Sequence, residues 1–228
     1  MISILVPTRE RINQLIKSID TFYEKSSNID NFEFILGVDN DDIETIDGIK
    51  NYISNNNYKN IKLIYFEKLG YSGLHLYFNE LVRHSIGELF WTIADDCECR
   101  TENWDLILKK YETGFHYVQV YCPQGDVNIT GIYNGFSLVP IVSKKWVELT
   151  GRIGLNSQTD LWMGAVVRNM THNGYPNIID HEYSIVIDMV LPSDISRHTG
   201  HLIDLPEIAK ELHNDLLKIK AYVDSINK

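Results

Sequence analysis

Two hydrophobic periods alternate along the first half of the chain. Continuous apolar runs of strand length occupy residues 2–7, 32–39, 61–66 and 89–94. Between these runs, apolar residues recur every three or four positions over 12–23, 43–53 and 74–82. Strands that are apolar throughout are typical of a buried parallel sheet, whereas a spacing of three or four predicts helices with one buried face. The asparagine-rich stretch 54–60 is expected to be a loop.

Repeated strand–helix–strand order predicts parallel strands that are joined by crossover helices. We therefore expect an α/β fold in which a mostly parallel sheet carries helices on both faces. The second half of the chain is less regular, and a mixed region of this kind usually adds antiparallel edge strands and builds the far wall of a cleft. Strands are expected there at 116–121, 136–140 and 183–190, and helices at 143–151 and 160–172.

The C-terminal segment has its own helical pattern. Asp204 and Glu207 have the spacing of a capping box. The apolar positions that follow at helical spacing are Ile208, Leu212, Leu216, Ile219, Val223 and Ile226. A helix packed on its own domain is one interpretation, and the seam of a homodimer is the alternative. We expect a single domain over 1–228, with a nucleotide-binding half (1–105), an acceptor half (106–203) and a C-terminal helix (204–228).

Charge and cysteine usage narrow the functional classes. The net charge of −10 argues against nucleic acid as a partner, because proteins that bind the phosphate backbone usually present a basic face. Cys97, Cys99 and Cys122 are too few for a disulfide framework in a chain of 228 residues, which favours a reducing compartment. The N-terminus has no basic leader, and no apolar run is long enough for a transmembrane segment. A cytoplasmic location is expected.

Acidic residues gather where two of the expected strands end. Asp39 closes the second strand, and Asp95 and Asp96 follow the fourth. Open parallel sheets bind ligands beyond the carboxyl ends of their strands, so these acids should share one rim. Crowded carboxylates repel one another, and a divalent cation such as Mn²⁺ or Mg²⁺ would relieve that repulsion while sharing ligand phosphates. A solvated acidic turn is the alternative.

The short motifs at these strand ends occur in a recognisable order. They are PTR (7–9), VDNDD (38–42), a helical Asn79 and ADD (94–96). In this order they resemble the nucleotide-binding half of family 2 glycosyltransferases, which have the Rossmann-like GT-A fold. The resemblance covers residues 1–105 and continues more loosely to about residue 200. ADD stands where the family has its D-x-D motif.

The resemblance implies roles for the matched residues. Asp96 would coordinate the metal, and Asp95 would contact the ribose or the metal. Asp39 would form a hydrogen bond with the nucleobase, usually uracil, and Thr8 would lie close beside it. The Arg that is common before the helical Asn is Phe78 here, so a phosphate contact would fall to His75 or Arg83. The remaining nucleotide-binding candidates are Pro7, Arg9 and Asn79.

The second half should supply the catalytic base and further ligands. Asp160 opens an expected helix and resembles the acid that acts as the family's base, although it could be only an N-cap. Metal sites of related enzymes are often completed by a histidine near the C-terminus, for which His198 is preferred over His201, with His181 a weaker candidate. Trp104 or Trp162 could offer a ring to the acceptor, although a tryptophan in an α/β protein is more often part of the core.

The leading hypothesis is a metal-dependent, inverting glycosyltransferase of the hexosyltransferase type. It would move a sugar from a nucleotide-sugar donor to a hydroxyl of a glycan or another acceptor. The resemblance implies a UDP-sugar as the donor, because uridine is the family's usual nucleoside. One alternative is a GT-A domain that binds a nucleotide sugar without turnover. The other is a sugar-1-phosphate nucleotidyltransferase, which is disfavoured because residues 7–13 lack the glycine-rich loop of those enzymes.

Overall fold

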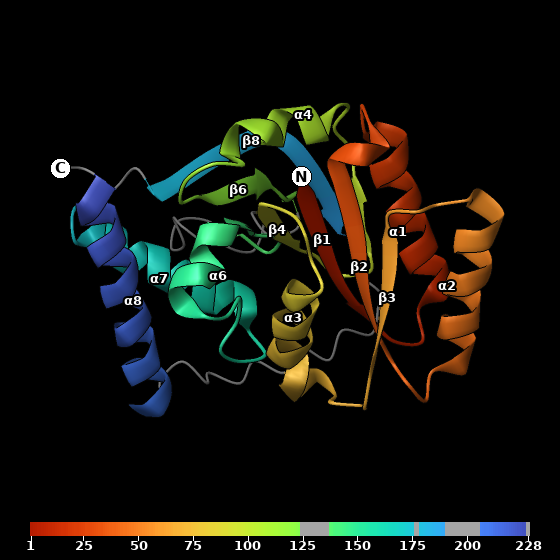
Figure 1. The fold of residues 1–228 in the computed structure, drawn as a ribbon, viewed down its shortest axis with the longest axis horizontal. Coiled ribbons are helices and arrows are strands. Elements are labelled where there is room, and N and C mark those ends of the chain that lie inside the picture. The colour runs from red at the N-terminus through yellow and green to blue at the C-terminus, as the bar shows by residue number, and fades with distance from the viewer. Residues whose placement is uncertain (124–136, 176–177, 190–205, 227–228) are drawn as a thin grey trace.

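An eight-stranded mixed sheet forms the centre of the protein, in the order β3-β2-β1-β4-β7-β6-β8-β5 (Figure 1). The structure is a computed structural model that describes residues 1–123, 137–175, 178–189 and 206–226. Four neighbouring strands are parallel, and they are β1 (Ile2–Thr8), β2 (Phe32–Asp39), β3 (Ile61–Phe66) and β4 (Leu89–Thr92). The other strands are β5 (Cys97–Cys99), β6 (Tyr117–Tyr121), β7 (Ile141–Ser143) and β8 (Ile179–Met189).

The predicted alternation in the first half is confirmed. Each crossover contains a helix, and these are α1 (Ile12–Lys25), α2 (Ile43–Asn56) and α3 (Leu74–Arg83). The second helix extends into the expected asparagine-rich loop and ends where Asn57 takes the left-handed conformation, with φ of 53°. Asparagine tolerates that conformation because its short polar side chain can bond locally.

The second half supplies the antiparallel pairs. β7 is antiparallel to both β4 and β6, and β5 is antiparallel to β8, whereas β6 and β8 are parallel. The helices of this half are α4 (Trp104–Leu108), α6 (Lys144–Thr150), α7 (Thr159–His172) and α8 (Pro206–Ile226). Short 3₁₀ turns occupy Ile29–Asn31, Tyr71–Gly73 and Lys109–Tyr111.

The strand expected at 136–140 is wrong over its described part. Residues 137–140 form no strand, and the ladder begins at Ile141. Pro140 has no N–H to donate. The carbonyl oxygen of Val139 accepts from the indole Nε1 of Trp91 at 3.0 Å, so it is occupied by a side chain and not by a strand. An apolar run alone did not reveal either constraint.

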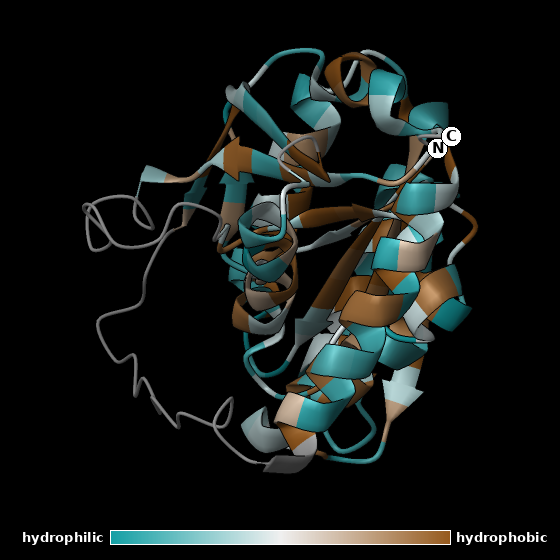
Figure 2. Ribbon diagram, turned by 90° about the vertical axis from the view of Figure 1, so that its left-hand side faces the viewer, coloured by the Kyte–Doolittle hydropathy of each residue, from teal (hydrophilic) through white to brown (hydrophobic). Residues whose placement is uncertain are grey.

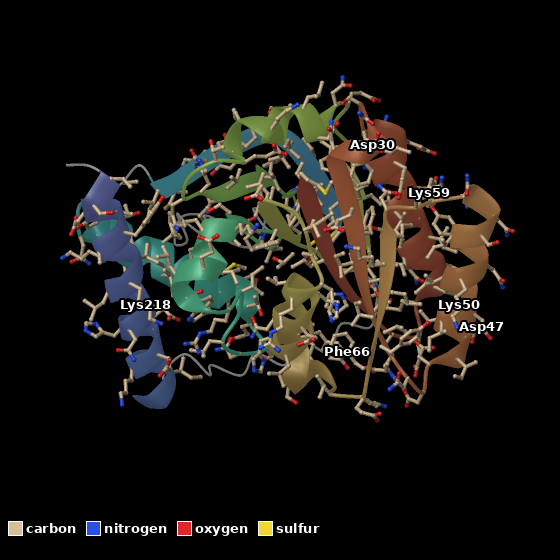
Figure 3. The ribbon with its side chains drawn as sticks, viewed as in Figure 1. Asp30, Asp47, Lys50, Lys59, Phe66 and Lys218 are labelled. Carbon is tan, nitrogen blue, oxygen red and sulfur yellow. The ribbon has the colours of Figure 1, made fainter. Side chains whose placement is uncertain are left out.

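Alternate residues of the strands feed two separate cores. On β1, Ile4 and Val6 belong to the apolar cluster beneath α1, whereas Leu5 belongs to the cluster beneath α3. This is the two-residue period of a strand that is buried on both faces. Figure 2 shows hydrophobic residues gathered on the interior strands and hydrophilic ones on the outer faces of the helices. Figure 3 shows labelled charges such as Lys50 on α2 and Lys218 on α8 at the outside.

The two tryptophans that were expected to touch an acceptor lie in these cores. Trp104 is fully buried, and its Nε1 donates to the carbonyl oxygen of Phe22 at 3.0 Å. Trp162 is 1% exposed and packs edge-on against Trp146. Neither ring offers a face to a ligand, so the core interpretation is confirmed for both tryptophans.

The C-terminal helix packs on its own domain. Ile219 and Val223 of α8 are buried against α6 and α7. Arg152 ties the helix to the loop after α6, with its Nη2 2.8 Å from Glu211 and its Nε 3.4 Å from Asp215. The homodimer interpretation remains a prediction. Asp204 of the expected capping box lies outside the described residues, and none of the described helices has the length and apolarity that a membrane crossing needs.

Candidate functional site

A cavity of about 430 Å³ opens beyond the carboxyl ends of β1, β2 and β4. Its wall is continued by the Tyr71–Gly73 turn, the start of α3 and the start of α7. The side chains that carry chemistry here are Pro7, Thr8, Arg9, Arg11, Asp39, Asp95 and Asp160. Most strand-end residues named from the sequence therefore converge on one rim, as the parallel order β2-β1-β4 requires, whereas Asp96 is absent from the cavity wall.

Asp39 is held from both sides at the end of β2. The side chain is buried, and its Oδ2 accepts from Nη1 of Arg9 at 2.9 Å. Its Oδ1 accepts from the hydroxyl of Tyr77 on α3. That hydroxyl in turn accepts from the backbone N–H of Leu69 at 3.0 Å. Burial, and then the bond to Asp39, raises the pKa of Tyr77 to about 12, so the hydroxyl stays protonated and donates. The Asp39 carboxylate is thus fixed in orientation.

Asp95 and Asp96 are both buried, at 4% and 6% exposed. Oδ2 of Asp95 accepts from the Thr8 hydroxyl at 2.8 Å, which links the ends of β1 and β4. Arg11 bridges the pair, with Nη1 2.8 Å from Oδ1 of Asp95 and Nη2 2.8 Å from Oδ2 of Asp96. Desolvation raises the pKa of Asp95 to about 6, against the opposing effects of Arg11 and of the Thr8 hydrogen bond.

The donor set at this acid pair fits a hard divalent cation. The oxygens of two carboxylates are the ligands that Mn²⁺ and Mg²⁺ prefer. Oδ1 of Asp96 is buried without a hydrogen-bond partner among the described residues, so it has coordination capacity to spare. A cationic group, the Arg11 guanidinium, already lies against both acids. No cluster of three or more metal-ligating side chains occurs in the part of the chain that the structure describes. Further ligands would have to be phosphate, water or residues outside that part.

Arg11 is the residue of this site that the sequence analysis missed. It is the residue just before α1, and only its backbone serves the helix, because its carbonyl accepts from Leu15 at 3.0 Å. Its position two residues after Arg9, on the same rim as the acids, was the available signal. Nothing in the pattern told which arginine would reach across to β4.

Asp160 comes from the opposite wall of the cavity. It is the second residue of α7, and Gln158 occupies the N-cap position, so Asp160 is not the cap. It lines the cavity and is partly buried. This desolvation raises its pKa to about 6, and the backbone amides of Leu161 and Asp160 offset only part of the effect. A carboxylate with a raised pKa at the wall of a cavity is suited to accept a proton.

Three nucleotide-binding candidates on α3 do not line this cavity. The Asn79 amide binds a loop: its Oδ1 accepts from the N–H groups of Ile153 (2.8 Å) and Gly154 (3.1 Å), and its Nδ2 donates to the carbonyl oxygen of Gly154 (2.8 Å). His75 is half-buried, and its Nδ1 has no partner among the described residues, while desolvation lowers its pKa. Arg83 is exposed and pairs with Glu80.

The histidines expected to complete a metal site are not placed at the acid pair. His198 and His201 lie outside the described residues. His181 is exposed on β8, where its ring packs on Tyr183 with centroids 5.2 Å apart, and it is absent from the cavity wall. The assignment of His198 as a ligand remains a prediction.

Comparison with known proteins identifies the family. A family model described as Glycosyl transferase family 2 matches residues 3–163. The chain belongs to this family. The matched segment contains the carboxyl ends of β1, β2 and β4 and extends past Asp160. It therefore includes all of the side chains of the cavity named above. A search of curated proteins found no match.

Solved structures show the same fold for this family 2 chain. One is a mannosyltransferase from Pyrobaculum calidifontis in complex with GDP-Man and Mn²⁺, with a TM-score of 0.67 and 15% identity over 84% of this chain and 57% of that one. Another is TarS 1–349 of S. aureus in complex with UDP-GlcNAc, with a TM-score of 0.66 and 12% identity over 95% of this chain and 66% of that one. The chain spans less than two thirds of either neighbour. The GT-A fold expected from the sequence is confirmed.

Proposed function

We propose that this protein is a glycosyltransferase that moves a sugar from a nucleoside-diphosphate sugar to a hydroxyl group of a glycan or another acceptor. The observation that carries the proposal is a cavity with Asp39 and Asp95 on one wall and Asp160 on the other. Family membership supports the same reaction class. Two structural neighbours, one in complex with GDP-Man and Mn²⁺ and the other with UDP-GlcNAc, support a nucleotide-sugar donor.

Asp39 and Asp95 are suited to grip the nucleoside of the donor. Tyr77 and Arg9 hold the Asp39 carboxylate at the cavity wall, where it can accept a hydrogen bond from a nucleobase N–H. Thr8 orients Asp95 in the same way for a ribose hydroxyl or a cation. A uracil base is the one that the family resemblance favours. The donor would therefore be a UDP-sugar.

The acid pair is suited to hold Mn²⁺ or Mg²⁺ through Asp96 and Asp95. When bound, such a cation would neutralise the negative charge that grows on the departing diphosphate. His198 is proposed as a further ligand, as in the sequence analysis. The small number of cysteines supports a cytoplasmic location for the reaction.

Asp160 is the proposed general base. In its ionised form the carboxylate takes the proton of the acceptor hydroxyl while the acceptor oxygen forms a bond to the anomeric carbon. The bond from that carbon to the diphosphate oxygen breaks, and its electron pair leaves with the nucleoside diphosphate. Attack from the side opposite the leaving group would invert the anomeric configuration, and the presence of Asp160 in the same cavity as Asp95 supports its role as the base.

A ligand screen tests this proposal. Thermal unfolding is measured with UDP, GDP, TDP and CDP, each with and without Mn²⁺. A nucleotide at 100 times its dissociation constant should stabilise the fold by about 2.7 kcal/mol. We expect the largest shift from UDP with Mn²⁺. If no nucleotide changed the melting temperature from that of the protein alone, the proposal would be contradicted.

A further inference from the structure

The negative charge of the acid pair is already partly balanced by a group of the chain itself. The Arg11 guanidinium donates a hydrogen bond to Oδ2 of Asp96 at 2.8 Å and forms an ion pair with Oδ1 of Asp95 at the same distance. The Thr8 hydroxyl takes the other oxygen of Asp95, so only Oδ1 of Asp96 is left without a partner among the described residues. A cation that used both carboxylates would have to share, on Asp95, an oxygen that Arg11 or Thr8 now holds, and it would lie next to the guanidinium.

We propose that Arg11 is a built-in counter-ion of Asp95 and Asp96, and that it must release them before a divalent cation can bind. The inference rests on the proposed function, because it assumes that the acid pair is the metal site. A guanidinium and a divalent cation repel each other at the distances of a shared carboxylate. The two occupants are therefore mutually exclusive, and Arg11 lowers the affinity for metal.

The geometry allows Arg11 to move without disturbing the fold. Its side chain is 30% exposed and borders the cavity, so solvent and ligand space lie beside it. Its side chain makes no capping bond to α1, and the backbone carbonyl that starts the helix is independent of it. A long side chain with these surroundings can rotate while residues 11–15 keep their positions.

Arg9 provides a matched control. It is an arginine two positions away, it borders the same cavity, and its side chain is 27% exposed. It pairs with Asp39, Asp41 and Glu10 and makes no ion pair with Asp95 or Asp96. Arg9→Gln removes the same charge from the same cavity but leaves the acid pair bridged. This control separates direct competition between Arg11 and Mn²⁺ for the two carboxylates from a general change in the electrostatic potential of the cavity.

The experiment is a Mn²⁺ titration of the whole chain, followed by the EPR signal of unbound Mn²⁺, with and without UDP. When a binding-competent state is only fractionally populated, the apparent affinity is reduced by that fraction. If Arg11 occupies the pair about nine tenths of the time, Arg11→Gln should bind Mn²⁺ about tenfold more tightly than the parent. Arg9→Gln should show a clearly smaller change. Arg11→Lys, which keeps the charge but has no fork to bridge both acids, should fall between.

Thermal unfolding supplies a second measurement that a merely structural role would not reproduce. Without metal, Arg11→Gln should melt below the parent because two buried carboxylates lose their cation. Added Mn²⁺ should raise the melting temperature of Arg11→Gln by more than that of the parent. A purely structural role would lower the melting temperature of Arg11→Gln by the same amount with and without Mn²⁺.

The outcomes separate this inference from the proposed function. Equal or weaker Mn²⁺ binding by Arg11→Gln, while the parent binds Mn²⁺ with UDP, would overturn the role of Arg11 and leave the glycosyltransferase intact. Equal tightening in Arg9→Gln would overturn it as well. If the parent and all variants bind no Mn²⁺, the metal site itself is wrong, and the inference goes with it. The nucleotide screen without metal then still decides whether the cavity binds a donor.

Discussion

The hydroxyl of Tyr77 on α3 donates a hydrogen bond to Oδ1 of Asp39 at the end of β2. The contact joins a helix to the strand end that it covers, inside the candidate nucleotide cavity. It leaves the Asp39 carboxylate one orientation, since Arg9 holds the other oxygen at 2.9 Å. A carboxylate held in this way is ready to accept a hydrogen bond from a base without first being ordered.

Tyr77→Phe should therefore weaken nucleotide binding. Removing the hydroxyl releases Asp39 and also leaves the Leu69 N–H without its acceptor. We expect a loss of about 1–2 kcal/mol in UDP affinity, which is roughly five- to thirtyfold, measured by isothermal titration calorimetry. Tyr65→Phe is the control, because Tyr65 is an exposed tyrosine on β3. An unchanged UDP affinity in Tyr77→Phe would show that Asp39 does not read the base.

Asp160→Asn should separate catalysis from binding. The amide is nearly the same size but cannot take a proton, so transfer should fall by about 10²–10⁴-fold in kcat. UDP binding with Mn²⁺ should stay within about twofold of the parent, because Asp39 and Asp95 line the cavity from other elements than Asp160 does. Sugar transfer is followed by release of UDP, and binding by calorimetry. Retained turnover would remove Asp160 from the mechanism, and a parent without turnover would favour a binding domain.

The raised pKa of Asp160 predicts an acidic limit to activity. The base must be ionised, so kcat/KM should fall as the pH drops below about 6, by about tenfold per unit. Saturating Mn²⁺ is present throughout, because it keeps Asp95, whose pKa is also about 6, in its ionised form. A profile that stays flat down to pH 5 would contradict the assignment.

The same pKa makes a prediction about stability. The pKa of Asp160 rises from an ordinary 3.8 to about 6 on folding, so the folded protein binds the proton more tightly than the unfolded chain. The stabilising effect of that proton is complete below about pH 4 and is lost as the pH rises through 6. Asp160→Asn avoids this loss. Its melting temperature relative to the parent should therefore increase between pH 4 and pH 7, as measured by calorimetry.

Much of the fold could be predicted because its signals are local. The apolar runs gave β2 and β3 with their observed ends, and Gly151, with φ of 79°, ends α6 where the sequence indicated. The strand at 136–140 failed because Pro140 and the indole of Trp91 act on particular backbone groups. Hydrophobicity alone left two interpretations open for Trp104 and Trp162, since it does not tell a core position from a cavity wall.

The candidate site was predictable only as far as strand ends determine it. Asp39, Thr8 and Asp95 share a rim because β2, β1 and β4 are adjacent. Arg11 could not be identified from the sequence because it is separated from its partner Asp95 by most of the nucleotide-binding half of the chain. Motif matching assigned Asn79 to the nucleotide, whereas its partners, Ile153 and Gly154, lie in the second half of the chain.

Asn79 carries the last prediction. Its three hydrogen bonds fix residues 153–154, and this loop leads directly to Ser157, Thr159 and Asp160 in the cavity wall. Asn79→Ala should destabilise the fold by about 1–3 kcal/mol in urea unfolding, because the backbone groups of the loop lose their partners. It should also lower kcat more than it weakens UDP binding, since it displaces Asp160 and not Asp39 or Asp95. Asn79→Asp keeps the acceptor for Ile153 and Gly154 and should lose less, while Asn51→Ala, at an exposed position on α2, should change neither property. If UDP affinity fell and kcat did not, Asn79 would belong to the nucleotide site after all.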